Sequence, residues 1–165
     1  MMRHCTPYSP TLILLPALIW LAAACHKPEG YHAFHALPTD GWSKHDTVTF
    51  TLPRLETTAH CRAFVEIRHS GHYPYRSIWL TVSRNTADSL TFHTDTVECR
   101  LTDDKGHFDG TGLNDLYQKR FPLSDVILQA HTAPLVKIAP FLKDQQLKGI
   151  TDIGIRLVPL RDDNR

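Results

Sequence analysis

The feature of this sequence that most constrains its fold is a repeated alternation of apolar and polar residues. In residues 48–52, 61–67, 78–82 and 97–101 an apolar side chain occupies every second position. Because successive side chains of a β-strand point to opposite faces, this period of two is typical of strands with one buried face. Glycine-containing turn sequences, such as that at residues 70–71, separate the segments. The sequence therefore predicts strands joined by tight turns.

Two further segments, 126–130 and 153–157, alternate in the same way. About seven short strands at these intervals are typical of an antiparallel β-sandwich, so the predicted fold class is all-β. Between residues 135 and 147 the pattern leaves room for one short helix, which Pro140 would interrupt. We assign the sandwich domain to residues 37–165.

The phase of the alternation changes once inside a single predicted strand. Leu90 and Phe92 have the opposite parity from Val97. One extra residue in a strand shifts the phase in this way. The sequence therefore predicts a β-bulge or a break near residues 93–95.

The N-terminus has the features of an export signal. Arg3 precedes an apolar run at residues 11–24, which is shorter than the roughly 20 residues that a membrane-spanning helix needs. Three alanines end the run directly before Cys25, similar to the lipobox of bacterial lipoproteins, in which the cysteine thiol is joined to diacylglycerol before cleavage. We therefore predict a lipoprotein signal peptide at residues 1–24. Acyl chains such as palmitate on Cys25 would then anchor the protein to the membrane.

The segment after the cleavage site differs from the rest of the chain. Residues 25–36 begin with the predicted lipid-bearing cysteine and continue with proline and glycine, without any clear periodicity. Such a composition predicts a short tether between the anchor and the domain.

Charge and motifs exclude several classes of function. The 18 Lys and Arg residues nearly balance the 17 Asp and Glu residues, so there is no basic excess to bind the phosphates of a nucleic acid. The sequence has no nucleophile elbow, phosphate-binding loop or dinucleotide fingerprint, which predicts a protein that is not an enzyme and needs no cofactor.

The eleven histidines raise the question of a metal site. His32 and His35 are three residues apart, as are His69 and His72, but these pairs fall in the predicted tether and in a predicted turn. No third ligand follows at a recognisable spacing, so we predict solvated histidines and no metal site. The glycine-rich stretch 103–112 lacks the alternating acids of a calcium loop and is more typical of consecutive turns.

Two cysteines and three aromatic residues leave alternatives open. Cys61 and Cys99 share the parity of core residues, so they could form a disulfide outside the cytosol or remain buried thiols. Tyr73, Tyr75 and Trp79 could form an exposed platform for a ligand or partner, or they could pack at the core or edge of the sandwich.

Four stretches, in order along the chain, carry a resemblance to a known family. They contain Leu37-Pro38 and Gly41-Trp42, then Tyr73-Pro74-Tyr75 and Ile78-Trp79-Leu80, then Asp95-Thr96-Val97 with Gly106, Gly110 and Gly112, and finally residues 149–156. Together with Cys25, they resemble the gliding-motility lipoprotein GldH family of Bacteroidetes over almost the whole chain after the signal peptide. Phe108 departs from the family pattern, which has a tryptophan there.

This resemblance implies a location and a process but no chemical mechanism, because the family offers no catalytic residues to carry over. It implies a lipid-anchored protein of the cell envelope, in the outer membrane and facing the periplasm. There it would act as a non-enzymatic accessory or scaffold component of gliding motility or the associated secretion machinery, through contacts with envelope proteins. The alternative is a glycan- or peptide-binding lipoprotein that uses the three aromatic residues.

Overall fold

The computed structural model describes residues 30–85, 91–141, 143 and 145–160, and Cys25 and Leu90 lie outside these ranges. The described residues form twelve β-strands and no helix, so they contain no helix that could cross a membrane. This confirms the all-β prediction, although the number of strands exceeds the seven or so expected. The strands are β1 (His32–Ala36), β2 (Trp42–Ser43), β3 (Val48–Thr51), β4 (Ala59–Ser70), β5 (Ser77–Asn85), β6 (Phe92–Arg100), β7 (Thr111–Leu113), β8 (Leu116–Pro122), β9 (Val126–Leu128), β10 (Leu135–Pro140), β11 (Gln146–Leu147) and β12 (Ile150–Pro159).

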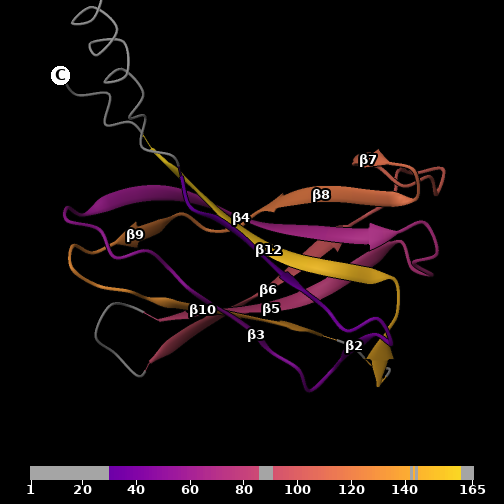
Figure 1. Ribbon diagram of the computed structural model, residues 1–165, viewed down its shortest axis with the longest axis horizontal. Helices are drawn as coiled ribbons and strands as arrows, with labels where there is room; N and C mark the ends of the chain where they lie inside the picture. Colours follow the sequence, from indigo (N-terminus) through magenta and orange to yellow (C-terminus); the bar gives the residue numbers. More distant parts are fainter. Residues whose placement is uncertain (1–29, 86–90, 142, 144, 161–165) are drawn as a thin grey trace, which may run out of the picture.

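Two antiparallel sheets face each other as the layers of a sandwich (Figure 1). The large sheet has the strand order β1-β12-β4-β8-β7, and β9 pairs with the first residues of β4. The small sheet has the order β3-β10-β5-β6. A separate two-stranded pair joins β2 to β11. Strands distant in sequence thus lie side by side, above all β4 and β12 at the centre of the large sheet.

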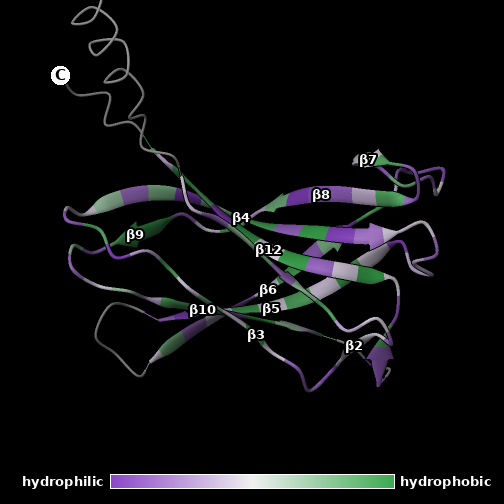
Figure 2. Ribbon diagram, in the orientation of Figure 1, coloured by the Kyte–Doolittle hydropathy of each residue, from purple (hydrophilic) through white to green (hydrophobic). Residues whose placement is uncertain are grey.

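The core lies between the two sheets, where the apolar half of each alternating segment points inward. Val65 and Ile67 of β4 and Ile155 of β12 are buried on the large sheet, and they face Leu80 of β5 and Ile138 of β10 on the small one. Figure 2 shows the alternation as hydrophobic and hydrophilic bands along β4 and β12. The period of two read from the sequence is therefore the period of the core.

The predicted tether is wrong for its last five residues. His32–Ala36 form β1, which pairs with β12 along its whole length. Ala33 packs against the core, and a Cβ atom added to Gly154 would lie only 2.7 Å from the ring of Phe34, so this ring sits directly on the backbone of β12. The segment joins the domain because a neighbouring strand supplies partners that its own sequence does not reveal.

The predicted bulge near residues 93–95 is also wrong. β5 and β6 pair without any shift in register, from Asn85 opposite Phe92 to the end of the strand. Phe92 instead lies on the outer face of the small sheet, where Nζ of Lys137 is 4.3 Å from the centre of its ring. The change of phase therefore marks an aromatic side chain on the solvent side, not an extra residue.

The described residues between 135 and 147 form no helix, contrary to the short helix expected there. Residues 135–140 form β10, a central strand of the small sheet with Val136 and Ile138 buried. Pro140 is the last residue of this strand, so its missing N–H falls where the pairing with β5 ends.

Candidate functional site

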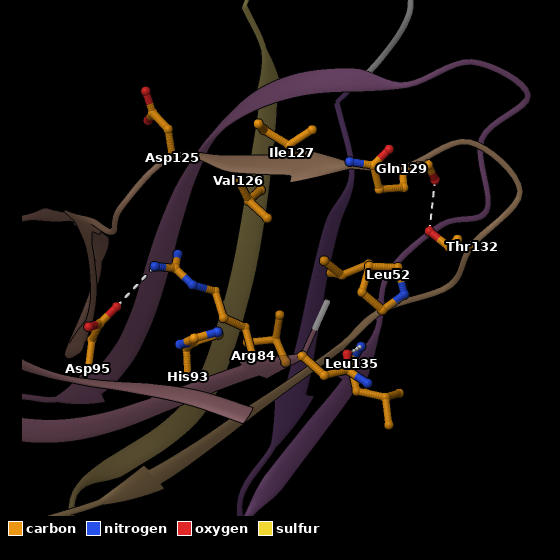
Figure 3. Close-up of a pocket in the computed structure, with 13 residues that line it drawn as sticks. Leu52, Arg84, His93, Asp95, Asp125, Val126, Ile127, Gln129, Thr132 and Leu135 are labelled. Carbon is orange, nitrogen blue, oxygen red and sulfur yellow. Dashed lines mark hydrogen bonds and ion pairs between the residues drawn. The ribbon is translucent and has the colours of Figure 1, made fainter. Parts of the chain in front are cut away.

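A cavity of about 640 Å³ opens between the two sheets at one end of the sandwich (Figure 3), and we call it the large cavity. Its size falls within the usual range for ligand pockets. Leu52, Val126, Leu135 and Val136 supply apolar walls from both sheets. The polar groups around them are Arg84, Asn85, His93, Asp95, Asp125, Gln129 and Thr132.

Most of these polar groups already serve the fold. Nη2 of Arg84 donates to the carboxylate of Asp95 (3.0 Å), and its Nη1 donates to the carbonyl oxygen of Ser124 (3.0 Å). The backbone N–H of Leu135 donates to the side-chain oxygen of Asn85 (2.6 Å). Arg84 is thus paired with Asp95 on the small sheet and bonded to the loop before β9. Its charge is therefore already used within the fold.

A second cluster, which we call the Glu66 cluster, covers the outer face of the large sheet. Glu66 points outward from β4, as its parity predicts, yet it is fully buried. The amide Nε2 of Gln118 donates to its Oε2 (2.8 Å), and Nε2 of His32 lies 3.1 Å from the same oxygen. Nε of Arg120 lies 3.0 Å and Nε of Arg156 3.7 Å from Oε1, as ion pairs rather than aligned hydrogen bonds. One carboxylate therefore links β1, β12, β4 and β8.

Sequence analysis missed this cluster because its partners come from four separate strands. The local sequence shows only that Glu66 has the same outward parity as Arg62 and Arg68. An outward position predicts solvent exposure, but here the long side chains of the neighbouring strands cover the carboxylate. Arg68 adds to this cover, since its guanidinium lies 3.7 Å from the centre of the Phe34 ring.

His69 is fully buried, which corrects the prediction that it is a solvated loop residue. It is the second-last residue of β4 and lies among the rings of Tyr73, Phe108 and Tyr117, with ring centres 4.7–5.9 Å away. Its Nδ1 is 3.0 Å from the carbonyl oxygen of Ser70, and its Nε2 has no partner. Burial lowers the pKa of His69, so the neutral ring is favoured.

The three aromatic residues singled out in the sequence differ in their burial. Tyr73 belongs to the core, where its hydroxyl donates to the carbonyl oxygen of Ser77 (3.1 Å) and burial raises its pKa. Tyr75 and Trp79 are 47% and 44% exposed. Phe141, which the sequence analysis did not single out, is 66% exposed and hydrogen-bonds through its backbone N–H to the carbonyl oxygen of Trp79 (2.8 Å).

We call Tyr75, Trp79 and Phe141 the aromatic patch. They line a shallow depression of about 310 Å³ together with Arg76 and Lys143. Two cations beside exposed rings form a surface suited to contact with a partner or a ligand. The aromatic patch lies near the start of β5, at the opposite end of the sandwich from the large cavity.

Cys61 and Cys99 are both buried free thiols. Cys61 lies on β4, eight residues before His69, and about 3.3 Å per residue places these two positions roughly 26 Å apart. Cys99 lies close to Tyr73, which contacts His69. The two thiols are therefore at opposite ends of the sandwich. Of the two alternatives left open by the sequence, the structure has the buried free thiols and not the disulfide.

The described histidines and acids form no group of three or more that could hold a metal ion. The acidic loop after β6 has a structural role instead. The backbone N–H groups of Lys105 and His107 donate to Asp103 Oδ1 (2.9 and 2.8 Å). The bond from His107 holds the pKa of the Asp103 carboxyl below its usual value. This loop is a turn closed by its own aspartate.

Comparison with known proteins settles the family. The sequence profile of the GldH lipoprotein family matches residues 29–157, which includes all strands but the last two residues of β12. The chain belongs to the GldH lipoprotein family. It is 28% identical to the gliding motility lipoprotein GldH of Flavobacterium johnsoniae over 151 residues, which cover 88% of this chain and 93% of the relative. The gliding motility lipoprotein GldH homolog of Christiangramia forsetii is 24% identical, with 84% and 89% covered.

Two solved structures are weakly similar to this GldH-family chain. A tumour necrosis factor, Eiger from S. frugiperda, has a TM-score of 0.37 at 11% identity and covers 83% of this chain and 98% of its own. A family 35 carbohydrate-binding module from Clostridium thermocellum has a TM-score of 0.40 at 14% identity, with 78% and 90% covered. Neither likeness carries an argument about function.

Proposed function

We propose that this GldH-family lipoprotein is a non-enzymatic accessory or scaffold component of the gliding motility apparatus or of the secretion machinery associated with it. The observation that carries the proposal is the family match along nearly the whole described domain, to relatives named as gliding motility lipoproteins. A lipid on Cys25 would hold the domain at the outer membrane, facing the periplasm. Its partners would be other envelope proteins.

The arrangement of side chains supports a scaffold. Arg84 and Asp95 in the large cavity are paired with each other, and Glu66 is enclosed by cations and an amide. These contacts hold strands together. The aromatic patch, by contrast, offers exposed apolar rings with Arg76 and Lys143 beside them, as protein interfaces commonly do. We infer that a protein partner binds there.

Gene deletion and complementation test this proposal. Deletion should impair motility or secretion, and the wild-type gene should restore it. Asp104→Ala and His107→Ala variants should restore it as well, because both side chains are exposed and neither lines the depression beside the aromatic patch. A Trp79→Ala, Phe141→Ala variant should fail to restore function at a normal membrane level.

Two outcomes contradict the proposal. If the loop variants abolish function while folding and membrane level stay normal, the loop has a chemical role and the protein is not merely a scaffold. If the double variant of the aromatic patch restores full function at a normal membrane level, the partner binds elsewhere.

A second candidate function is glycan or peptide binding. Trp79 and Tyr75 favour it, because exposed rings above a depression with cationic neighbours can stack on a sugar or an extended peptide. Binding to a glycan or peptide array that disappears in Trp79→Ala would support this function. The fluorescence of the buried Trp42 then checks that the Trp79→Ala variant is still folded.

A further inference from the structure

Three exposed apolar side chains gather on the outer face of the large sheet, at one end of the sandwich. Ile127 of β9 is 52% exposed, Val158 of β12 is 41% exposed and Leu160, just after β12, is 36% exposed. Ile127 lies opposite His60 in the register, and the backbone N–H of Leu160 donates to the carbonyl oxygen of His60 (2.8 Å). Val158 lies opposite Arg62, two residues further along the same face. We call Ile127, Val158 and Leu160 the apolar end patch.

The first described residue of the chain lies directly beside this patch. The backbone N–H of Leu157 donates to the carbonyl oxygen of Tyr31 (2.8 Å), which places Gly30 next to Val158. A Cβ atom added to Gly30 would lie 2.0 Å from the carbonyl oxygen of Leu157, so the two backbones are in contact. Figure 1 shows the same arrangement, with the start of β1 and the end of β12 meeting near β9.

The length of chain before Gly30 sets how far the domain can lie from its anchor. Residues 26–29 separate Gly30 from Cys25. Even fully extended, this segment spans at most about 18 Å, since each residue adds roughly 3.6 Å. A lipid on Cys25 therefore keeps the apolar end patch close to the bilayer surface, whatever path the segment takes.

We propose that the apolar end patch is a docking face for the phospholipid bilayer, which the anchored domain contacts with Ile127, Val158 and Leu160. This inference rests on the lipid anchor at Cys25 proposed above. Apolar side chains gain free energy at the boundary between headgroups and acyl chains, where His60 and Arg62 beside them can reach the headgroups. The side chain of Arg62 is 57% exposed, and its Nε lies 4.0 Å from Oδ1 of Asp125. Because this ion pair is long and exposed, Arg62 can turn toward a phosphate group instead.

A weak contact is sufficient at this position. The anchor makes docking an intramolecular event with an effective concentration on the order of millimolar. Docking would also orient the molecule, because the aromatic patch lies at the other end of the sandwich and would then face away from the membrane. The same geometry thus presents the proposed partner site to the periplasm.

The test uses the full lipidated chain in vesicles of phosphatidylethanolamine and phosphatidylglycerol. Single cysteines are introduced as Val158→Cys or Leu113→Cys and labelled with a fluorophore, while the native Cys61 and Cys99 stay unlabelled because they are buried. Leu113 is the matched control, an apolar residue of β7 that is 80% exposed. Leu113 pairs with Leu116, which in turn pairs with Ser70 of β4, whereas Val158 pairs with Arg62 of the same strand. Ser70 and Arg62 are eight residues apart, so the two labels are separated by roughly 26 Å along β4.

Lipids that carry a nitroxide in the headgroup region should quench the label at 158 and leave the label at 113 unquenched. Replacement of the two other patch residues, Ile127→Ser and Leu160→Ser, should abolish the quenching at 158 while the protein still floats with the vesicles. Equal quenching at both positions, or quenching at neither, would overturn the docking face.

Flotation keeps this inference separate from the anchor on which it rests. If the chain does not float with the vesicles, the anchor fails. If it floats but shows no difference between the two labels, only the docking face fails. Protection of the label at 158 in detergent, accompanied by dimerisation, would identify a second copy of this chain as the occupant and would also overturn the proposal.

Discussion

Replacement of Glu66 by glutamine tests whether the Glu66 cluster stabilises the fold as its geometry indicates. Glutamine has the shape of glutamate but carries no charge, so Glu66→Gln removes the ion pairs with Arg120 and Arg156 without opening a cavity. In either orientation of the new amide, its NH2 group also faces another donor: Gln118, which binds a carboxylate oxygen at 2.8 Å in the wild type, or the two arginines.

The structure sets the size of the effect. Loss of one partner of a buried ion pair costs about 3–5 kcal/mol when the other charge is left buried. Here Arg120 and Arg156 remain 45% and 34% exposed, so water can hydrate both guanidinium groups after the carboxylate is lost. The cost then falls to that of the lost charge-assisted hydrogen bonds, about 2 kcal/mol. With a urea slope of about 2 kcal/mol per molar, the unfolding midpoint should fall by about 1 M.

Equilibrium unfolding in urea at pH 7.5, followed by tryptophan fluorescence, measures this change. Glu98→Gln is the matched control, an exposed glutamate on β6 that should change the midpoint very little. A double-mutant cycle of Glu66→Gln with Arg120→Gln should give a coupling of about 1 kcal/mol, reduced by the exposure of the arginine. A Glu66→Gln protein as stable as the control, or a coupling of zero, would refute this account of the cluster.

Three further predictions concern the ends and the core of the molecule. Cys25→Ser should release the protein from membrane fractions or leave an uncleaved precursor, and unchanged membrane retention would contradict lipidation. Burial raises the pKa of Cys61 and raises that of Cys99 to about 12, so neither thiol should react with a disulfide reagent in the native protein at pH 8. Both should react in unreduced, denatured protein, and their failure to react there would indicate a bond. Because burial lowers the pKa of His69 below the value of about 6.5 that it has in the unfolded chain, the unfolded state binds more protons below that pH. The free energy of unfolding should therefore fall as the pH drops below about 6.5. Urea titrations above and below this pH should show a smaller fall for His69→Phe than for the wild type.

The fold was predictable wherever the decisive interaction is local. Val65 and Ile67 alternate with polar residues because one face of β4 is buried, and a register shifted by one residue would turn that apolar face to solvent. The phase of Phe92 misled the prediction because a single aromatic residue on the outer face looks the same in sequence as an inserted residue. Its contact with Lys137 belongs to a neighbouring strand and leaves no mark near residue 92.

The candidate sites were harder to predict because most of them depend on contacts between strands that are far apart in sequence. The anchor motif before Cys25 is contiguous, so it can be read directly. The environment of Glu66 depends on β1, β8 and β12, and the exposure of Phe141 depends on where β10 ends beside β5. These are long-range contacts, and the alternation of polar and apolar residues determines which face a side chain is on but not what covers it.

The pairing of β1 with β12 has a mechanical consequence for a protein held by its N-terminus. β1 is joined to β12 by five consecutive residue pairs, from His32 opposite Arg156 to Ala36 opposite Asp152. Tension that pulls on the chain before His32 acts along the strand, and the hydrogen bonds of an antiparallel pair run across it. Such a load shears all the bonds together instead of peeling them one after another, so the strand resists extraction until the whole ladder gives way. Traction on the anchor is thus passed into the centre of the large sheet.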